Sequence, residues 1–240
     1  MRRQGFCLIE MNNPGLSDQH VMHSLMLPPD KDGWSHPGSD FAEIYLGEDT
    51  SSLMMWMADT PEHLAFDGER MSRWYDPLVS LGSCLLPVTE PFLGFRASDY
   101  HGGAHLRKPF VRKDDLNLTQ SSGVTEDDVA AGLVECHLDF ARRRRLCMMN
   151  AIICQEGIEL WEKADPSHKR FRLELQHNRM LIFRHDVFGY RYSPVNGSEL
   201  IVQAWMLEEP PQLDITSFAG SQRSLESILG GPTLNPEKQV

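Results

Sequence analysis

The chain has 240 residues, of which 41% are apolar, so it can bury one sizeable core and belongs among globular rather than disordered proteins. Its formal net charge of −11 repels phosphate backbones, which disfavours a nucleic-acid partner. No apolar run is long enough to cross a bilayer, and the run Phe6–Ile9 after Arg2 and Arg3 is too short for a secretory signal, so we expect no membrane segment and a cytoplasmic location.

The N-terminal part of the chain predicts short extended segments and one helix. Gly5–Ile9 has the composition of a strand, and Ser17 is a suitable N-cap for a helix over Asp18–Leu27. Two further segments, Ile44–Gly47 and Leu53–Met57, are expected to be extended and separated by a polar turn.

A longer helix is predicted between Glu69 and Leu86, because apolar residues recur there every three or four positions. These residues are Met71, Trp74, Tyr75, Leu78, Leu81 and Leu85. Pro87 and Pro91 are expected to end the helix. We expect this helix to brace the sheet-rich remainder of the chain.

The next segment is rich in glycine, histidine and basic residues. It predicts two strand fragments, Gly94–Arg96 and Pro109–Val111, on either side of a loop. His101 and His105 in that loop are possible metal ligands, but histidines flanked by glycine in a polar loop are more often exposed. We therefore expect both to be solvent-exposed.

Two interpretations are open for the segment that follows Val124. Thr125 and the three acids after it are a strong helix start, and the basic run Arg142–Arg145 suits the negative end of a helix dipole or a solvated turn. Helical spacing is kept by Val129, Leu133, His137 and Phe140. Alternatively, a strand begins at Leu133, which places His137 and Asp139 on the same face of a pleat.

The pattern after this segment predicts strands separated by short polar turns. The expected strands are Leu146–Cys154, Ile158–Trp161, Phe171–Leu175, Met180–Phe183, Phe188–Tyr192 and Leu200–Leu207. We expect a single domain over residues 1–211. The segment 212–240, rich in glycine, proline, serine and glutamine, is expected to be a flexible tail or linker.

The motifs of this region occur in a characteristic order: His137-x-Asp139, the strand Leu146–Ile153, Gly157–Leu160, Arg179–Phe183 and Tyr190–Pro194. In this order they resemble the iron(II)/2-oxoglutarate-dependent oxygenases of the prolyl 4-hydroxylase type. The resemblance implies an α+β protein whose core is a double-stranded β-helix, similar to a jelly roll, braced by N-terminal helices.

The resemblance also implies a metal site. In the family, a His-x-Asp pair and a second histidine form a facial triad that leaves three positions on Fe(II) open. His137 and Asp139 match the first two ligands, and Tyr190 stands where the second histidine belongs. His185, five residues upstream of Tyr190, is the alternative third ligand.

The co-substrate position departs from the family pattern as well. A basic residue must hold the distal carboxylate of 2-oxoglutarate, because that charge is costly to bury unpaired. Counting back from Trp205, this position falls on Glu199, an acid that repels the carboxylate. Arg184 and Arg191 are the candidates to supply the missing positive charge from neighbouring strands.

The sequence thus favours an oxygenase-like protein. If it is active, hydroxylase-type chemistry is expected, but the departures from the family pattern predict an incomplete site, and therefore a pseudoenzyme. The alternative is a non-catalytic binding or accessory barrel, tethered by its tail to a larger assembly, with a small-molecule or protein ligand in the barrel mouth. If the helical interpretation holds, His137 is a helix-face histidine and Asp139 a surface acid. A cysteine hydrolase using Cys136 is disfavoured, because no activating base is evident.

Overall fold

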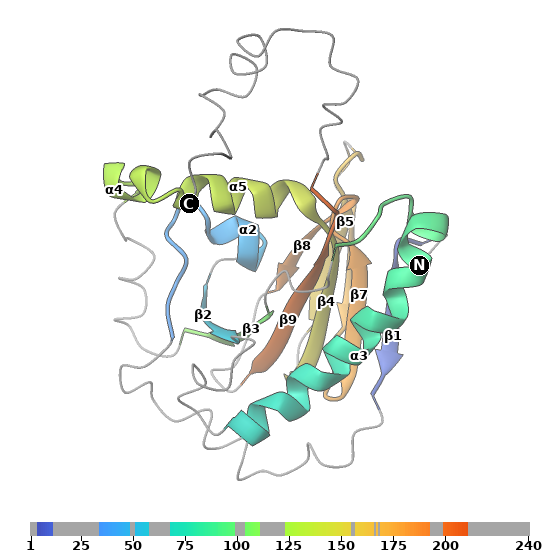
Figure 1. Cartoon of the computed structure of the whole chain (residues 1–240). Helices are drawn as coiled ribbons and strands as arrows, with labels where there is room; N and C mark the ends of the chain where they lie inside the picture. The colour runs from blue at the N-terminus through green and yellow to red at the C-terminus, as the bar shows by residue number, and fades with distance from the viewer. Residues whose placement is uncertain are drawn as a thin grey trace, which may run out of the picture. The chain divides into compact units, whose positions relative to one another are not determined.

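The computed structural model describes residues 4–11, 34–48, 51–57, 68–98, 104–110, 123–154, 157–165, 167, 169–192 and 199–210 (Figure 1). The helices are α2 (Ala42–Leu46), α3 (Gly68–Leu93), α4 (Glu126–Ala130) and α5 (Leu133–Arg143). The strands are β1 (Phe6–Glu10), β2 (Ser52–Met57), β3 (Ala104–Pro109), β4 (Arg144–Ile153), β5 (Gly157–Glu162), β6 (Arg170–Glu174), β7 (Arg179–Arg184), β8 (Phe188–Tyr192) and β9 (Leu200–Leu207). All of them belong to a compact unit, Met1–Glu209. The predicted helix Asp18–Leu27, the loop histidine His101 and the predicted tail lie outside the described residues.

The strands form two antiparallel sheets. The larger has six strands in the order β1-β7-β4-β9-β3-β2, and the smaller has three in the order β6-β5-β8. In the larger sheet, β4 lies between β7 and β9, with Cys147 opposite both Phe183 and Trp205. Because β4 is covered on both faces, it is apolar almost throughout, as the run Leu146–Cys154 predicted.

The two faces of the larger sheet contribute to two separate cores. One face packs against α3, where Leu78 is fully buried against strand residues such as Met148 and Val202 (Figure 1). The other face packs against the smaller sheet and α2, where Trp205 is fully buried. This inner face, between the two sheets, is where the fold can position a site.

Helix α3 is longer than predicted. It continues through Pro87 and Pro91 and ends at Leu93, so the prediction that these prolines stop it is wrong. Burial of its apolar face against the sheet outweighs the unfavourable proline positions. The helix is closed instead by Gly94, whose φ of 78° suits glycine and whose N–H donates to Thr89 and Glu90 carbonyls. No helix in the described ranges is long and apolar enough to cross a membrane.

Two segments with predicted extended structure are different in the structure. Ile44–Gly47 was expected to be a strand but lies largely in α2, because a helical turn buries Ala42, Tyr45 and Leu46 together. Gly94–Arg96 follows the end of α3 and is not a strand.

Of the predicted strand fragment Pro109–Val111, Pro109 ends a strand, Phe110 follows it, and Val111 lies outside the described residues. That strand is β3, which pairs with both β2 and β9. This longer strand includes His105, which is fully buried, so the prediction that His105 is exposed is wrong. Two neighbouring strands and the aromatic residues of the inner face cover it.

The segment after Val124 is helical, so the strand interpretation from Leu133 is wrong. Thr125 and Asp128 form a capping box, in which the Thr125 hydroxyl accepts from the Asp128 N–H (3.2 Å). Gly132, with φ of 72°, then separates α4 from α5. The capping signal and the helical spacing of the apolar residues decide the local structure here.

Candidate functional site

The inner face between the sheets carries a fully buried arginine, Arg107 of β3. Its Nε donates to the Ser52 hydroxyl (3.0 Å), and its Nη1 donates to the Leu46 carbonyl (2.8 Å). Its Nη2 donates to the Tyr192 carbonyl (3.4 Å), and the guanidinium lies 4.9 Å from the centre of the Tyr192 ring. These contacts offset the cost of burying the charge.

Tyr190 points from β8 into the same interior. Its hydroxyl donates to the Tyr45 carbonyl (2.8 Å) and accepts from Gln203 Nε2 (2.8 Å). Burial, reinforced by nearby Cys147, raises the pKa of Tyr190 to about 12. The phenol is therefore neutral and is committed to a network that joins α2, β8 and β9.

Glu199, which precedes β9, is buried beside this network. It accepts a hydrogen bond from the Tyr192 hydroxyl. Burial, followed by nearby Cys154 and by the bond and charge of Glu199, raises the pKa of Tyr192 far above its usual range. Glu199 is thus a buried acid; that it occupies the co-substrate position stays a prediction.

His105 occupies the inner face between two tryptophans. Its ring centroid lies 5.6 Å from that of Trp56 and 5.1 Å from that of Trp205. Neither ring nitrogen has a hydrogen-bond partner in the part of the chain that the structure describes. Burial first, and the charge of Arg107 second, lower the pKa of His105 to about 3, so the ring is neutral.

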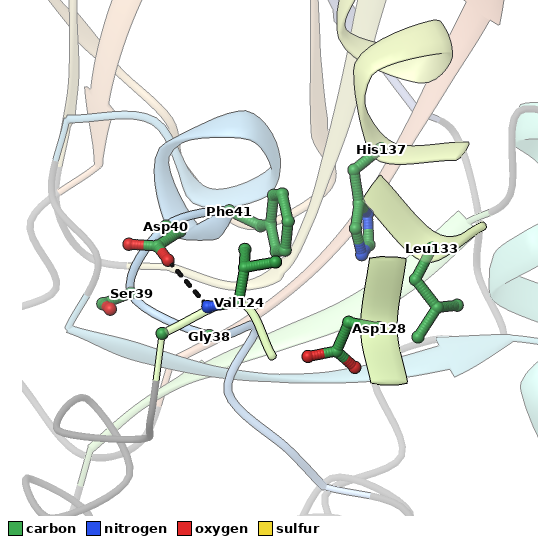
Figure 2. Close-up of a pocket in the computed structure, with 9 residues that line it drawn as sticks. Gly38, Ser39, Asp40, Phe41, Val124, Asp128, Leu133 and His137 are labelled. Atoms are coloured by element: carbon green, nitrogen blue, oxygen red, sulfur yellow. Dashed lines mark hydrogen bonds between the residues drawn. The ribbon is translucent and has the colours of Figure 1, made fainter. Parts of the chain in front are cut away.

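His137 lies midway along α5 and lines a shallow pocket of about 190 Å³ (Figure 2). Its ring packs against Phe41 with centroids 4.1 Å apart, and its Nδ1 lies 2.5 Å from the Tyr45 hydroxyl. Burial lowers the pKa of His137, and the charge of Asp128 opposes that effect. Figure 2 also shows Asp40, which accepts a hydrogen bond from the Val124 N–H (3.0 Å).

Asp139 contacts a different part of the molecule. Its carboxylate pairs with Arg142 (3.3 Å) and Arg143 (2.7 Å) of its own helix. Residues two positions apart on a helix point about 200° away from each other. The expectation that His137 and Asp139 share one face of a pleat is therefore wrong, because both lie on α5.

The remaining predicted site residues lie around β8. His185 is in the turn between β7 and β8, almost fully buried, with its ring centroid 5.8 Å from that of Tyr190. Arg184 donates from Nε to Asp186 (3.1 Å), which holds its guanidinium next to its own turn. Arg191 is exposed, on the opposite face of β8 from Tyr190. The structure thus joins His185 to Tyr190, whereas the contacts found for the other predicted residues lead elsewhere.

A larger cavity of about 410 Å³ lies where β4 begins and where β5 and β7 end. We call it the mouth pocket. It is lined by Glu43, Ile44, Gly47, Glu48, Arg144, Trp161, Lys163, His185, Gly189 and Tyr190. Arg144, Lys163 and His185 provide its basic side, and Ile44 and Trp161 its apolar walls.

These residues do not fit a facial triad. Such a site needs two imidazoles and a carboxylate around one metal ion. No group of three His, Cys, Asp or Glu residues able to hold a metal occurs among the described residues. Tyr190 is engaged by Tyr45 and Gln203, and Glu199 is a buried acid that accepts a hydrogen bond from Tyr192. We therefore derive no step through iron or the co-substrate.

Two residues that give the mouth pocket its charge, Arg144 and Lys163, could not be predicted as site residues from the sequence. The run Arg142–Arg145 was expected to be solvated as a whole, and only part of it is. Arg144 lines the pocket, because the strand register shifts between Arg144 and Leu146 and breaks the alternation that would have turned its side chain outward. Lys163 directly follows β5 and belongs to none of the sequence motifs described above, so nothing marked it as a site residue. No pattern in the sequence signals such a register shift.

Comparison with known proteins gives a fold but no family assignment. No family model matches the sequence, and no curated protein sequence matches it. A prolyl hydroxylase from Trichoplax adhaerens, solved with a peptide fragment of the hypoxia inducible factor oxygen degradation domain, is similar in structure. It has 12% identity over 86% of this chain and 85% of that chain, with a TM-score of 0.52.

Two other solved structures are similar at lower scores. The dioxygenase for auxin oxidation from Arabidopsis thaliana, in a complex with 2-oxoglutarate, has 13% identity over 88% of this chain and 85% of that one, with a TM-score of 0.49. A prolyl-4-hydroxylase from Pseudomonas putida has 10% identity over 85% and 93%, with a TM-score of 0.43. The Trichoplax structure carries the argument: the chain has the double-stranded β-helix fold of the 2-oxoglutarate- and iron-dependent oxygenases, as the resemblance predicted.

Proposed function

We propose that this protein is a non-catalytic binding domain, which keeps the oxygenase fold and holds a small-molecule ligand at the mouth of its barrel. The observation that carries this proposal is the hydrogen-bonded network of Tyr190, Gln203 and Tyr45. A metal ligand must offer its donor atom to the metal. Here the only polar atom of the Tyr190 side chain is already used to hold helix and strands together.

The packing around that network also supports a binding role. Tyr45 stacks on Phe140 with centroids 5.0 Å apart, and Phe140 meets Trp205 edge to face at 5.0 Å. These rings fill the space beside Tyr190, while the mouth pocket outside it keeps about 410 Å³. A volume of this size suits a small ligand. Fold and activity are separable, so the β-helix does not argue against this role.

The rival hypothesis is an iron oxygenase with a displaced site, and the fold favours it. In that case His185 and Tyr190, which are in contact, would be ligands, and His137 or Asp139 would have to move to join them. Arg184 or Arg191 would hold the 2-oxoglutarate carboxylate. This hypothesis requires iron and 2-oxoglutarate to bind cooperatively and the co-substrate to be decarboxylated.

Two measurements separate these hypotheses. Thermal unfolding is recorded with Mn(II), with 2-oxoglutarate and with both; we expect no stabilisation by the pair beyond the sum of the separate effects. Succinate is then measured after incubation with Fe(II), ascorbate, oxygen and 2-oxoglutarate, and we expect the amount formed without protein. Succinate above that background, lost in both Tyr190→Phe and His185→Asn, would overturn the proposal.

A further inference from the structure

The mouth pocket contains a cation, Arg144, that has no counter-charge in the part of the chain that the structure describes. Arg144 is half-buried and its Nη1 is fully covered, yet its side chain makes no hydrogen bond or ion pair among the described residues. The centre of the Phe140 ring lies 6.0 Å from its guanidinium carbon. A covered charge without a partner is costly, and arginine stays protonated in proteins. Within the described ranges this side chain therefore lacks an acceptor.

A second cation lines the same cavity. Lys163, after the end of β5, donates from Nζ to the His185 carbonyl (2.6 Å). Burial lowers the pKa of Lys163, the charge of Arg144 contributes in the same direction, and the charge of Asp186 opposes both. Two positive side chains in one cavity repel each other, so a negative group bound between them would lower the electrostatic energy of the pair.

The third polar group is the imidazole of His185. The residue is 4% exposed, and its Nε2 is covered and has no hydrogen-bond partner within the described chain. Burial lowers the pKa of His185 far below its usual range, with further contributions from Arg144 and Lys163. A buried polar atom without a partner, on the wall of a cavity, points to a ligand that supplies one.

The acids around the pocket, as far as the structure describes them, do not supply a counter-charge to Arg144 or a hydrogen-bond partner to His185 Nε2. Glu48 pairs with Arg170 at 2.7 and 2.9 Å, outside the basic side of the pocket. Asp186 pairs with Arg184. Glu43 lines the rim but is exposed, and it forms no ion pair in the part of the chain described. Among the described residues, Arg144 Nη1 and His185 Nε2 thus have no partner, and the Lys163 ammonium, which donates to one carbonyl, has further N–H groups to offer a ligand.

We propose that Arg144, Lys163 and His185 bind the oxyanion of a small ligand, a carboxylate or a phosphate, in the mouth pocket. This rests on the proposed binding function and names the chemical class of its ligand. The arginine fork and the lysine ammonium contact the oxygens in charge-assisted hydrogen bonds, and His185 Nε2 contacts a further oxygen. Ile44 and Trp161 leave room for the apolar part of the molecule.

Calorimetry on the full chain tests the proposal. Inorganic phosphate and succinate are titrated separately into protein in metal-depleted Tris chloride buffer, with sodium chloride at matched ionic strength as reference. Chelators are avoided because they are themselves polycarboxylates. We expect at least one anion to bind with a dissociation constant of about 1 mM or below. Binding of phosphate alone identifies a phosphate ligand, and binding of succinate alone identifies a carboxylate.

Three variants decide whether the named residues do the binding. Arg144→Gln and Lys163→Gln are each expected to weaken binding at least about tenfold, since each removes a charge-assisted bond. Arg142→Gln, on an exposed side chain of the same basic run, is the matched control and is expected to bind like the parent. Either charged-pocket variant suffices if the other does not fold. Absence of binding by both anions, or unchanged binding in the pocket variants, would overturn the inference.

The same titration repeated with Mn(II) keeps the two proposals apart. If an anion binds only when the metal is present, the proposed non-catalytic function fails. If no anion binds with or without the metal, this inference fails while the proposed function stands.

Discussion

Two buried or partly buried arginines differ in the hydrogen-bond acceptors that surround them, one inside the barrel and the other at its mouth. Arg107, between the sheets, donates to a hydroxyl and two carbonyls and packs on the Tyr192 ring. Arg144, at the mouth, has no such acceptor among the described residues. A buried charge with its acceptors in place holds the fold together, whereas one without them marks a place where a ligand can complete the structure.

The largest expected effect comes from removing the satisfied charge. Arg107→Met should lower the free energy of unfolding by about 3–5 kcal/mol, because it leaves buried acceptors on Leu46, Tyr192 and Ser52 without their donor, at about 1–3 kcal/mol each. Urea unfolding followed by circular dichroism measures the loss. Ser52→Ala removes one acceptor and is the control, with an expected loss of about 1 kcal/mol. A loss below about 1 kcal/mol for Arg107→Met would mean that the interior charge is not structural.

A second charge placed in the interior should be nearly as damaging. The folded-state pKa of His105, about 3, lies below the ordinary value of 6.5. Between these pH values the imidazole is protonated in the unfolded chain and neutral in the folded chain. Its contribution to stability is complete above pH 6.5 and is lost as pH falls, by about 1.4 kcal/mol per pH unit. Between about pH 6 and pH 4 we expect a loss of about 2–3 kcal/mol from this residue.

The variant His105→Leu isolates that effect. Its free energy of unfolding should fall less steeply between these pH values than that of the parent, while other titrating groups act equally in both proteins. Urea unfolding at several pH values gives the two slopes. Parallel slopes would show that His105 is protonated without penalty, which would contradict the burial argument.

The strands were predictable because their side chains follow the pleat. Phe188–Tyr192 was expected as a strand, and β8 indeed turns Tyr190 inward and Arg191 outward. The helix α5 was predictable from the capping residues around Thr125, although the His-x-Asp likeness favoured a strand. The capping hydrogen bonds determine the local conformation there, whereas a resemblance over three residues does not predict it.

The site was less predictable, because its residues owe their positions to tertiary structure. Arginine is seldom buried, so nothing in the sequence marks Arg107 as an interior residue. Arg144 differs from Arg142 only through a local shift of strand register, which periodicity cannot reveal. Tyr190 and Glu199 were predicted to depart from the family pattern, and in the structure each is buried and hydrogen-bonded, Tyr190 to Tyr45 and Glu199 to Tyr192.

A smaller effect is expected when one bond of the interior network is removed. Tyr190→Phe deletes the hydroxyl that donates to Tyr45, but Gln203 Nε2 also reaches that carbonyl (3.3 Å). We therefore expect a loss of about 1 kcal/mol in the free energy of unfolding. A double-mutant cycle with Gln203→Leu measures the coupling and should give about 0.5 kcal/mol or more. Additive effects would mean that the two side chains do not act together.

The smallest effect is expected at the mouth, where Arg144→Met tests the other half of the comparison. The substitution removes a covered charge that has no counter-charge among the residues the structure describes, so the cost of its desolvation disappears together with its packing. We expect the free energy of unfolding to change by no more than about 1 kcal/mol. Urea unfolding in phosphate-free buffer measures this change. A loss as large as that of Arg107→Met would show that Arg144 already has a partner inside the chain. The mouth would then be a second structural network rather than a site that waits for a ligand.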